Sequence, residues 1–375
     1  MTSRHLVVSA VNLSEGGPLT VLIDSLDTAA ATLGPEWKIT ALVHDEKLIQ
    51  NPRVRAIAFP RSKRNWLSRL GLEWWKFKKL SLHLKPDLWL SLHDMTPRVK
   101  TRRQAVYCHN SSPFYKARLI EAKFDPRFFL FNKFYLYLYR LFVHRNYAVI
   151  VQQSWFRDAF QYETGHTNIV VARPARQAEP DYISIKNSPP TQLRIPTQDY
   201  PLRLFYPALP RVFKNIEILC EAIRLLPPSI FPLVDLRLTL DGTENKWAKE
   251  LLNRYGSNPS ISLIGRQDRS QMTTEYDNCD VVLFPSRLET WGLPIMEAKA
   301  FNKPLLVADL PYAHETVGDY SNIKFAAVDN AQPWVDAIVN MATGNWTPQV
   351  HQASEPEQPF MRDWPELWRY LASGL

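Results

Sequence analysis

Cysteine is scarce in this sequence. Cys108, Cys220 and Cys279 are the only three in 375 residues, and they lie far apart. None of them belongs to a CxxC pair or has a histidine nearby at the spacing of a metal site. This scarcity argues against a disulfide framework and against a structural zinc site, and it favours a reducing compartment.

Long apolar segments are missing too. There is no run of about twenty apolar residues, so we expect no segment that spans a bilayer. The opening MTSRHLVVSAV has one arginine and an apolar run too short for the core of a signal peptide, and it is more typical of a first strand. We therefore expect a cytoplasmic protein.

The charge is unevenly distributed along the chain. Residues 1–150 hold 24 Lys and Arg against 11 Asp and Glu, a balance of +13, so the remainder carries −5 to reach the total of +8. A basic half joined to a mildly acidic half indicates that the first half meets an anionic partner. Nucleic acid, a phosphorylated substrate and an anionic bilayer all satisfy this condition.

Short runs rich in Val, Ile and Leu alternate with longer amphipathic stretches. In the first half we predict helices at 20–33 and 66–84, and strands at 5–11, 38–44, 54–59, 87–92, 104–109 and 147–152. The alternation restarts later, with strands predicted at 202–208, 236–242, 261–266, 279–286 and 303–309, and helices at 215–226 and 294–301. Buried strands separated by helices are typical of an open parallel sheet with helices on both faces.

This pattern predicts an α/β protein of two doubly wound, Rossmann-like domains that face each other across a cleft. Residues 1–187 would form the first domain and residues 202–355 the second. The polar, proline-rich residues 188–201 would link them, and 356–375 would form a C-terminal helix that crosses back to the first domain. Ligands of such sheets bind at the carboxyl ends of the strands, so the loops there are the candidate sites.

The loop after the first predicted strand contains Gly16 and Gly17. These glycines would let the backbone approach a ligand closely, and Pro18 suits the first position of a helix. The free amides of that first helical turn would suit a phosphate. A simple glycine turn into a helix explains the stretch equally well.

The segment PALPRVFKNIEIL places Arg211, Lys214 and Asn215 between a strand and a helix. We expect both cations in the first helical turn, where the helix dipole disfavours positive charge. A bound phosphate would remove this conflict. The alternative is a solvated pair of charges.

The stretch ETWGLPIMEAKAF holds two glutamates, Glu289 and Glu297, eight positions apart. On one uninterrupted helix their side chains would lie roughly 80° apart and would not share a face. We therefore expect Glu289 on a loop and Glu297 in the first turn of a helix that begins near Pro294, with Gly292 in an unusual backbone geometry. Acids are common in first turns, whereas Glu289 is well placed to accept hydrogen bonds from sugar hydroxyls. The amides of Gly292 and Leu293 would remain free for a phosphate.

SRLETWGLPIMEA resembles the Glu–x7–Glu signature of glycosyltransferase family 4, retaining enzymes of the GT-B fold that use nucleotide sugars. RVFKN is similar to the basic phosphate-binding segment of that family, and LTLDG to the Gly-ended strand that follows it. ISLIGR, TTEYDNCDVVLFPS and HETVGD continue a resemblance that covers residues 202–330 well. The N-terminal half resembles the family in outline, through the Gly16–Gly17 loop and YCHN at 107–110.

The resemblance implies a role for each matching position. Glu297 would hold the ribose of the nucleotide, and Glu289 the hydroxyls of the donor sugar near the reacting carbon. Arg211 and Lys214 would neutralise the departing diphosphate, although they lie closer together here than in many members. His109 would face the donor sugar, or else be a satisfied polar group at a strand end. The implied donor-binding set is Gly16, Gly17, Arg211, Lys214, Asn215, Glu289, Thr290, Trp291, Gly292, Leu293 and Glu297.

The implied chemistry needs no metal. Breaking the bond between the anomeric carbon and diphosphate creates negative charge that fixed cations and helix-end amides can stabilise. No DxD motif follows a predicted strand, and we expect no cofactor besides the nucleotide-sugar co-substrate. The sequence leaves open whether Glu289 is a nucleophile or only orients the sugar. Attack from the same face is the usual proposal for the family.

The first half combines basic and aromatic residues. Residues 53–103 hold fourteen Lys and Arg against three Asp and Glu, interleaved with tryptophans, and residues 124–145 add a dense aromatic face beside Lys133, Arg140 and Arg145. This combination suits an interfacial helix on anionic lipid, although core aromatics beside a solvated face explain 124–145 equally well. No nucleic-acid motif accompanies the charge, so we expect no nucleic-acid partner. We expect a peripheral location at the inner face of the cytoplasmic membrane.

Three functions remain open. The leading hypothesis is a retaining, metal-independent hexosyltransferase that uses a UDP- or GDP-linked sugar in bacterial surface polysaccharide or lipopolysaccharide assembly. Its first domain would bind a saccharide or lipid-linked saccharide acceptor. A sugar-nucleotide 2-epimerase of the same fold would need acid/base carboxylates from both domains and no acceptor. A non-catalytic sugar-nucleotide-binding module would tolerate loss of Glu289, which this chain retains together with Glu297.

Overall fold

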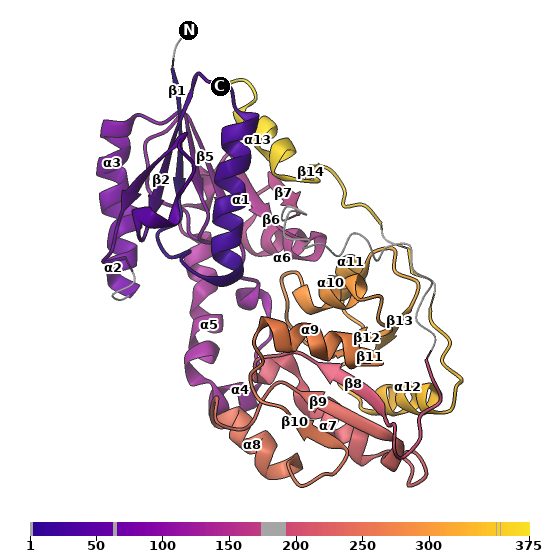
Figure 1. Ribbon diagram of the computed structural model, residues 1–375. Coiled ribbons are helices and arrows are strands. Elements are labelled where there is room, and N and C mark those ends of the chain that lie inside the picture. The colour runs from indigo at the N-terminus through magenta and orange to yellow at the C-terminus, as the bar shows by residue number, and fades with distance from the viewer. Residues whose placement is uncertain (1–2, 63–65, 174–192, 350, 353) are drawn as a thin grey trace. The chain divides into compact units, whose positions relative to one another are not determined.

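The computed structural model describes residues 3–62, 66–173, 193–349, 351–352 and 354–375 (Figure 1). The chain divides into two compact units. Unit 1 consists of Met1–Phe114, Lys133–Glu179 and Pro356–Leu375, and unit 2 of Tyr115–Asn132 and Pro180–Glu355. Residues 115–132, which the sequence pattern placed in the first domain, thus group with unit 2. Residues 188–192 of the expected linker lie outside the described residues.

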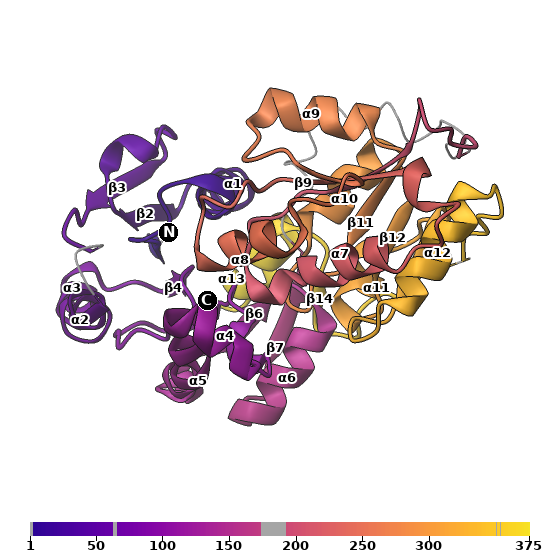
Figure 2. The same ribbon diagram turned by 90° about the horizontal axis from the view of Figure 1, so that it is seen from below.

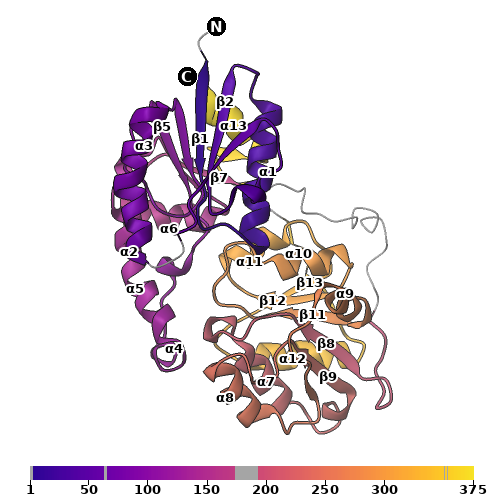
Figure 3. The ribbon, with the colours of Figure 1, turned by 60° about the vertical axis from the view of Figure 1, so that its left-hand side comes forward.

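Unit 1 contains a parallel sheet of eight strands in the order β14-β7-β6-β5-β4-β1-β2-β3 (Figure 3). The strands are β1 (Arg4–Ser9), β2 (Trp37–Val43), β3 (Val54–Ala58), β4 (Leu88–Ser91), β5 (Arg103–Tyr107), β6 (Ala148–Val151), β7 (Ile169–Ala172) and β14 (Phe360–Met361). Successive side chains of a strand point to opposite faces, and accordingly Val7 and Val8 enter two separate apolar clusters. Burial on both faces explains the continuous apolar runs in the sequence.

Helices cover both faces of the sheet of unit 1, with α1 and α13 on one side and α2 and α3 on the other (Figure 3). The helices are α1 (Gly16–Thr32), α2 (Trp66–Gly71), α3 (Phe77–Leu84), α6 (Ser154–Thr164) and α13 (Trp364–Ala372). A π-helical segment, Leu72–Lys76, joins α2 to α3, so the single helix predicted at 66–84 is present with one irregular turn. Short 3-10 segments occur at Glu46–Leu48, Ser112–Phe114 and Val143–Arg145.

The C-terminal helix belongs to unit 1 although unit 2 precedes it in the sequence. β14 pairs with β7, and α13 packs against α1. Trp364 and Trp368 are buried in the same cluster as Leu6 of β1, and the indole of Trp368 donates a hydrogen bond to the carbonyl of Ser25 at 3.0 Å. The expectation that this helix crosses back to the first domain is confirmed.

Unit 2 contains a parallel sheet of six strands in the order β10-β9-β8-β11-β12-β13. The strands are β8 (Leu202–Tyr206), β9 (Val234–Leu238), β10 (Ile261–Leu263), β11 (Val281–Phe284), β12 (Leu305–Ala308) and β13 (Ile323–Ala326). Numbered from β8, this is the Rossmann order 3-2-1-4-5-6. The two expected Rossmann-like sheets are therefore both present.

The helices of unit 2 lie on both faces of its sheet, and α7 and α12 pack side by side (Figure 2). They are α7 (Ile216–Arg224), α8 (Lys246–Tyr255), α9 (Arg269–Asn278), α10 (Leu293–Ala300), α11 (Pro311–Val317) and α12 (Gln332–Ala342), with 3-10 turns at Val212–Lys214 and Phe231–Leu233. α4 (Leu119–Phe124) also belongs to unit 2, and α5 (Pro126–Arg140) runs from unit 2 into unit 1. Among the described residues, no helix has the length and apolar character needed to cross a membrane.

Replacing Trp368 with Ala should lower the free energy of unfolding by about 3–5 kcal/mol, because the loss of a buried indole leaves a cavity in the core of unit 1. Chemical denaturation of the full chain measures this change. Trp75→Ala is the matched control: Trp75 is 59% exposed, and its replacement should cost less than about 1 kcal/mol. Equal losses in the two variants would contradict the packing of α13 into this core.

Candidate functional site

The strand order of unit 2 determines which of its loops come together. β8 and β11 are parallel neighbours, but the chain leaves β8 toward β9 on one side and leaves β11 toward β12 on the other. Loops at the carboxyl ends of such a pair diverge and leave room for a ligand. Residues 207–215 and 285–292 are these two loops, so the two segments singled out in the sequence lie at one edge of one sheet.

After β8 the chain forms a short 3-10 turn between Arg211 and Asn215. Asn215 has a left-handed backbone, with φ of 58°, and α7 begins directly after it. Arg211 and Lys214 thus precede α7, and the first turn of that helix holds Glu217. The expectation that both cations occupy the first turn is wrong, and the conflict with the helix dipole does not arise.

The structure brings Lys214 and Glu289 together. The Lys214 ammonium donates a hydrogen bond to the Glu289 carboxylate, and the two side chains are 19% and 14% exposed. The ammonium also lies 5.7 and 5.8 Å from the ring centroids of Phe213 and Phe284. An ammonium has three donors and no acceptor, so an anion that arrives at Lys214 would share these donors with Glu289.

Arg211 pairs with an acid that was not singled out in the sequence. Its guanidinium contacts the carboxylate of Asp125, which directly precedes α5 and is 86 residues away in the sequence. The same segment packs on the turn, because the rings of Tyr115 and Phe128 lie 6.4 and 5.0 Å from the ring of Phe213. Arg211 is half exposed, so solvent screens its pairing with Asp125.

Glu289 lies on the loop after β11, as expected. Gly292 ends that loop in a left-handed conformation, with φ of 77°, and α10 begins at Leu293, one residue before Pro294. The hydroxyl of Thr316 donates a hydrogen bond to the carbonyl of Trp291 and so holds the end of the loop. The segment Thr290–Gly292 therefore reaches the helix in a defined backbone path.

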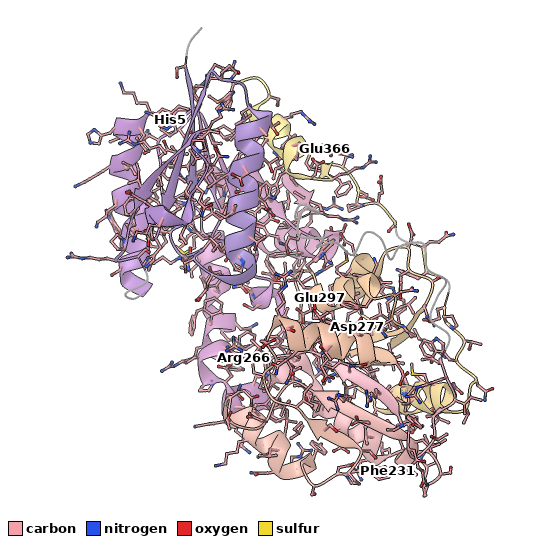
Figure 4. All side chains as sticks on the ribbon, viewed as in Figure 1. His5, Phe231, Arg266, Asp277, Glu297 and Glu366 are labelled. Carbon is pink, nitrogen blue, oxygen red and sulfur yellow. The ribbon has the colours of Figure 1, made fainter. Side chains whose placement is uncertain are left out.

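Glu297 is the fifth residue of α10, and the first turn of this helix has no acidic residue. The expectation that Glu297 lies in the first turn is therefore wrong. Its carboxylate accepts a hydrogen bond of 2.5 Å from the hydroxyl of Tyr276 on α9 (Figure 4 labels Glu297). Tyr276 is buried, so this bond holds the carboxylate in a fixed direction.

The remaining predicted residues belong to unit 1. Gly16 and Gly17 are the first two residues of α1, which begins slightly earlier than expected. His109 follows β5: its amide donates to Asp94 at 2.5 Å, and its Nε2 is bonded to the carbonyl of Leu92 at 2.7 Å. Burial lowers the pKa of His109, and this favours the neutral imidazole at pH 7.

The second half of the chain matches a known family. Residues 192–353 match the family described as glycosyl transferases group 1. The matched segment contains Lys214, Glu289 and Glu297, and it supports a glycosyltransferase. A comparison with curated proteins finds no match to this chain.

Several solved structures have a similar fold. Sucrose-phosphate synthase from Thermosynechococcus elongatus is 15% identical over 91% of this chain and 90% of its own, with a TM-score of 0.60. Anabaena Alr3699/HepE in complex with UDP-glucose is 14% identical over 91% and 93%, with a TM-score of 0.55. WaaG, a glycosyltransferase involved in lipopolysaccharide biosynthesis, is 12% identical over 98% and 94%, with a TM-score of 0.58. The expected GT-B fold is confirmed.

Replacing Gly292 with Ala should destabilise the protein by about 1–2 kcal/mol, because a side chain disfavours the left-handed backbone. A Cβ there would also approach Ile295 Cδ1 at 3.3 Å. Gly71→Ala is the matched control, since Gly71 has a helical backbone and open space around it; this change should be neutral or stabilise by up to about 1 kcal/mol. Denaturant midpoints measure both, and a Gly292→Ala protein as stable as Gly71→Ala would contradict the described loop.

Proposed function

We propose that this protein is a retaining glycosyltransferase of family 4. It would move a hexosyl unit from a UDP- or GDP-linked sugar to a saccharide or lipid-linked saccharide acceptor. The contact of Lys214 with Glu289 carries the proposal, because it joins a cation suited to a diphosphate to an acid suited to sugar hydroxyls. The position of this pair at the carboxyl ends of β8 and β11 supports it further.

Negative charge grows on the diphosphate as its bond to the anomeric carbon breaks. Lys214 and Arg211 would stabilise this charge, together with the first amides of α10 behind Gly292. These groups can supply the charge compensation that a divalent cation supplies in other enzymes. We therefore propose a reaction that needs no metal and no cofactor beyond the nucleotide sugar.

Retention of configuration would follow from attack on the same face of the sugar. The acceptor oxygen would form its bond to the anomeric carbon as the bond to diphosphate breaks, and the acceptor proton would pass to a diphosphate oxygen. Glu289 would orient the sugar through its hydroxyls, and Glu297, held by Tyr276, would bind the ribose. His109 would be neutral, so its proposed role is that of a hydrogen-bonding group and not of a charge.

Glu289→Gln should lower kcat by about 100-fold while the Kd for UDP or GDP changes less than about threefold, because Glu289 would touch the sugar and not the nucleotide. Glu297→Gln should instead weaken nucleotide binding about tenfold, the cost of one charge-assisted hydrogen bond. Calorimetry with UDP and GDP and initial rates with their sugars separate the two effects.

Glu221→Gln is the control for these two variants, because Glu221 pairs with Arg224 on α7 and lies on neither loop. Its kcat for sugar transfer and its Kd for UDP or GDP should equal those of the wild type. Equal and mild effects of the two site variants would contradict the proposed division of roles. Consumption of the sugar nucleotide by the wild-type protein without any acceptor would favour the epimerase, and binding without any turnover would favour the non-catalytic module.

α5 carries a feature that supports a membrane-bound acceptor. Leu130, Phe134 and Tyr137 follow one another at helical spacing and are all exposed, while Tyr135 and Tyr139 are buried on the other side of the helix. A helix that is apolar on both sides has a second surface to cover. Arg127 and Lys133, both exposed, lie on the same helix and would favour anionic lipid.

We propose that the protein works at the inner face of the cytoplasmic membrane in the assembly of bacterial surface polysaccharide or lipopolysaccharide. WaaG takes part in lipopolysaccharide biosynthesis, and this supports the setting. The basic first half and the exposed stripe Leu130, Phe134 and Tyr137 would meet the anionic lipid, and an acceptor carried on lipid would be reached from there.

Replacing Phe134 and Tyr137 together with Ser should weaken binding to phosphatidylglycerol vesicles about tenfold or more, since two aromatic side chains that would enter the bilayer surface are lost. Vesicle sedimentation at low and high salt measures it, and high salt should weaken binding of the wild-type protein. Tyr162→Ser on α6 is the control: Tyr162 is 88% exposed and outside the stripe, and binding should not change. Vesicle binding that changes neither with salt nor in the Phe134 and Tyr137 variant would contradict the proposed membrane-binding surface.

A further inference from the structure

Arg287 joins the two loops of the candidate site at the base of the Lys214–Glu289 contact. It lies between β11 and Glu289, and its main-chain N–H donates to the carbonyl of Phe213 at 2.8 Å. Its Nε donates to Oδ1 of Asn215 at 3.1 Å. Phe213 and Asn215 are the two residues on either side of Lys214, so Arg287 contacts the backbone on one side of that cation and a side chain on the other.

The same arginine also reaches a third loop, which follows β13. Its two terminal nitrogens donate to the carbonyl of Val328 at 2.5 Å and to the carboxylate of Asp329. Asn215 strengthens this arrangement, because its side-chain amide donates to the carbonyls of Pro285 at 3.2 Å and Val328 at 3.0 Å. The loops after β8, β11 and β13 are thus tied together through two side chains.

Burial and geometry indicate that Arg287 and Asn215 have a structural role. Arg287 is 12% exposed, and each of its three guanidinium nitrogens has an acceptor within the protein. Asn215 is 1% exposed and keeps a left-handed backbone that asparagine tolerates better than most residues. A guanidinium donates from three nitrogens that are fixed in one plane, whereas all the donors of a lysine ammonium lie on a single nitrogen.

We propose that Arg287 and Asn215 are positioning residues that keep Lys214 and Glu289 in register across the two loops. Neither would touch the ligand, because their polar groups are directed to the protein; for Asn215 this proposal replaces the donor-binding role that the family resemblance implies. The kinetic part of this inference rests on the proposed function. A shift of Lys214 against Glu289 would separate the group that neutralises the diphosphate from the group that orients the sugar, and misplacement of this kind can cost about 100-fold in rate.

Arg287→Met, made in the full chain, tests the inference because it keeps the length of the side chain and removes its donors. Hydrogen exchange of peptides that cover residues 212–217 and 287–291 should become about tenfold faster, since the guanidinium bonds to Asn215, Val328 and Asp329 are lost while the main-chain bond to Phe213 remains. The kcat for sugar transfer should fall about 30-fold while the Kd for UDP or GDP changes less than about threefold. A large loss of nucleotide affinity with unchanged exchange would instead make Arg287 a phosphate ligand and overturn the inference.

Arg237→Met is the matched control. Arg237 of β9 donates twice to the carboxylate of Glu275, at 2.7 Å each, so this variant also loses a partly buried ion pair but has no bond to the loops of the site. Its thermal stability should fall about as much as that of Arg287→Met, while loop exchange and kcat should match the wild type. If the two variants behave alike in exchange and rate, general destabilisation is the cause and the inference fails.

Asn215→Gly provides a second route if Arg287→Met does not fold, because glycine keeps the left-handed backbone and removes the side-chain amide. Like Arg287→Met, it should speed hydrogen exchange in the two loops and lower kcat. Unchanged hydrogen exchange would overturn the inference. Failure of the proposed function is distinguishable: a wild-type protein that transfers no sugar would refute that function. The exchange comparison would still decide whether Arg287 and Asn215 tie the loops together.

Discussion

The ion pair of Lys214 with Glu289 depends on the constraint that parallel strands end at the same edge of a sheet. β8 and β11 are hydrogen-bonded neighbours, although 75 residues separate the two charged side chains in the sequence. The chain turns away from this point in opposite directions, so the two loops diverge and leave room for a ligand. The other parts of the candidate site, such as the left-handed Gly292 and the turn at Asn215, shape the two loops that carry this ion pair.

A cation that already has an acidic partner can still bind an anion. The pair is mostly but not fully buried, so water still weakens the attraction between its members. A diphosphate carries more charge than one carboxylate and offers more acceptors, so it can share or replace Glu289 at Lys214. In the proposed reaction, this exchange would release the Glu289 carboxylate toward the donor sugar when the phosphates bind at Lys214. Binding of one end of the donor would thereby prepare the contact with the other end.

Much of the fold could be predicted from the sequence, because buried parallel strands are continuous apolar runs whose pattern is local. The strands β7, β13 and β14 were not predicted; they are short, and most of unit 2 separates β14 from its partner β7 in the sequence. The placement of Glu289 on a loop followed from the helix breaker beside it. The pairing of Arg211 with Asp125 could not be predicted, because nothing local in either segment indicates a partner so distant in the chain.

Unit 1 and unit 2 share a strand order at their centres, yet their loops contain different chemistry. In both sheets the first strand lies between the second and the fourth. In unit 1 the loop after β4 holds Asp94, whose carboxylate accepts the amides of His109 at 2.5 Å and Asn110 at 3.0 Å and so shapes a turn. In unit 2 the equivalent loops hold a cation and an acid in direct contact. The topology therefore determines where ligands can bind, and the side chains placed there determine which ligand it is.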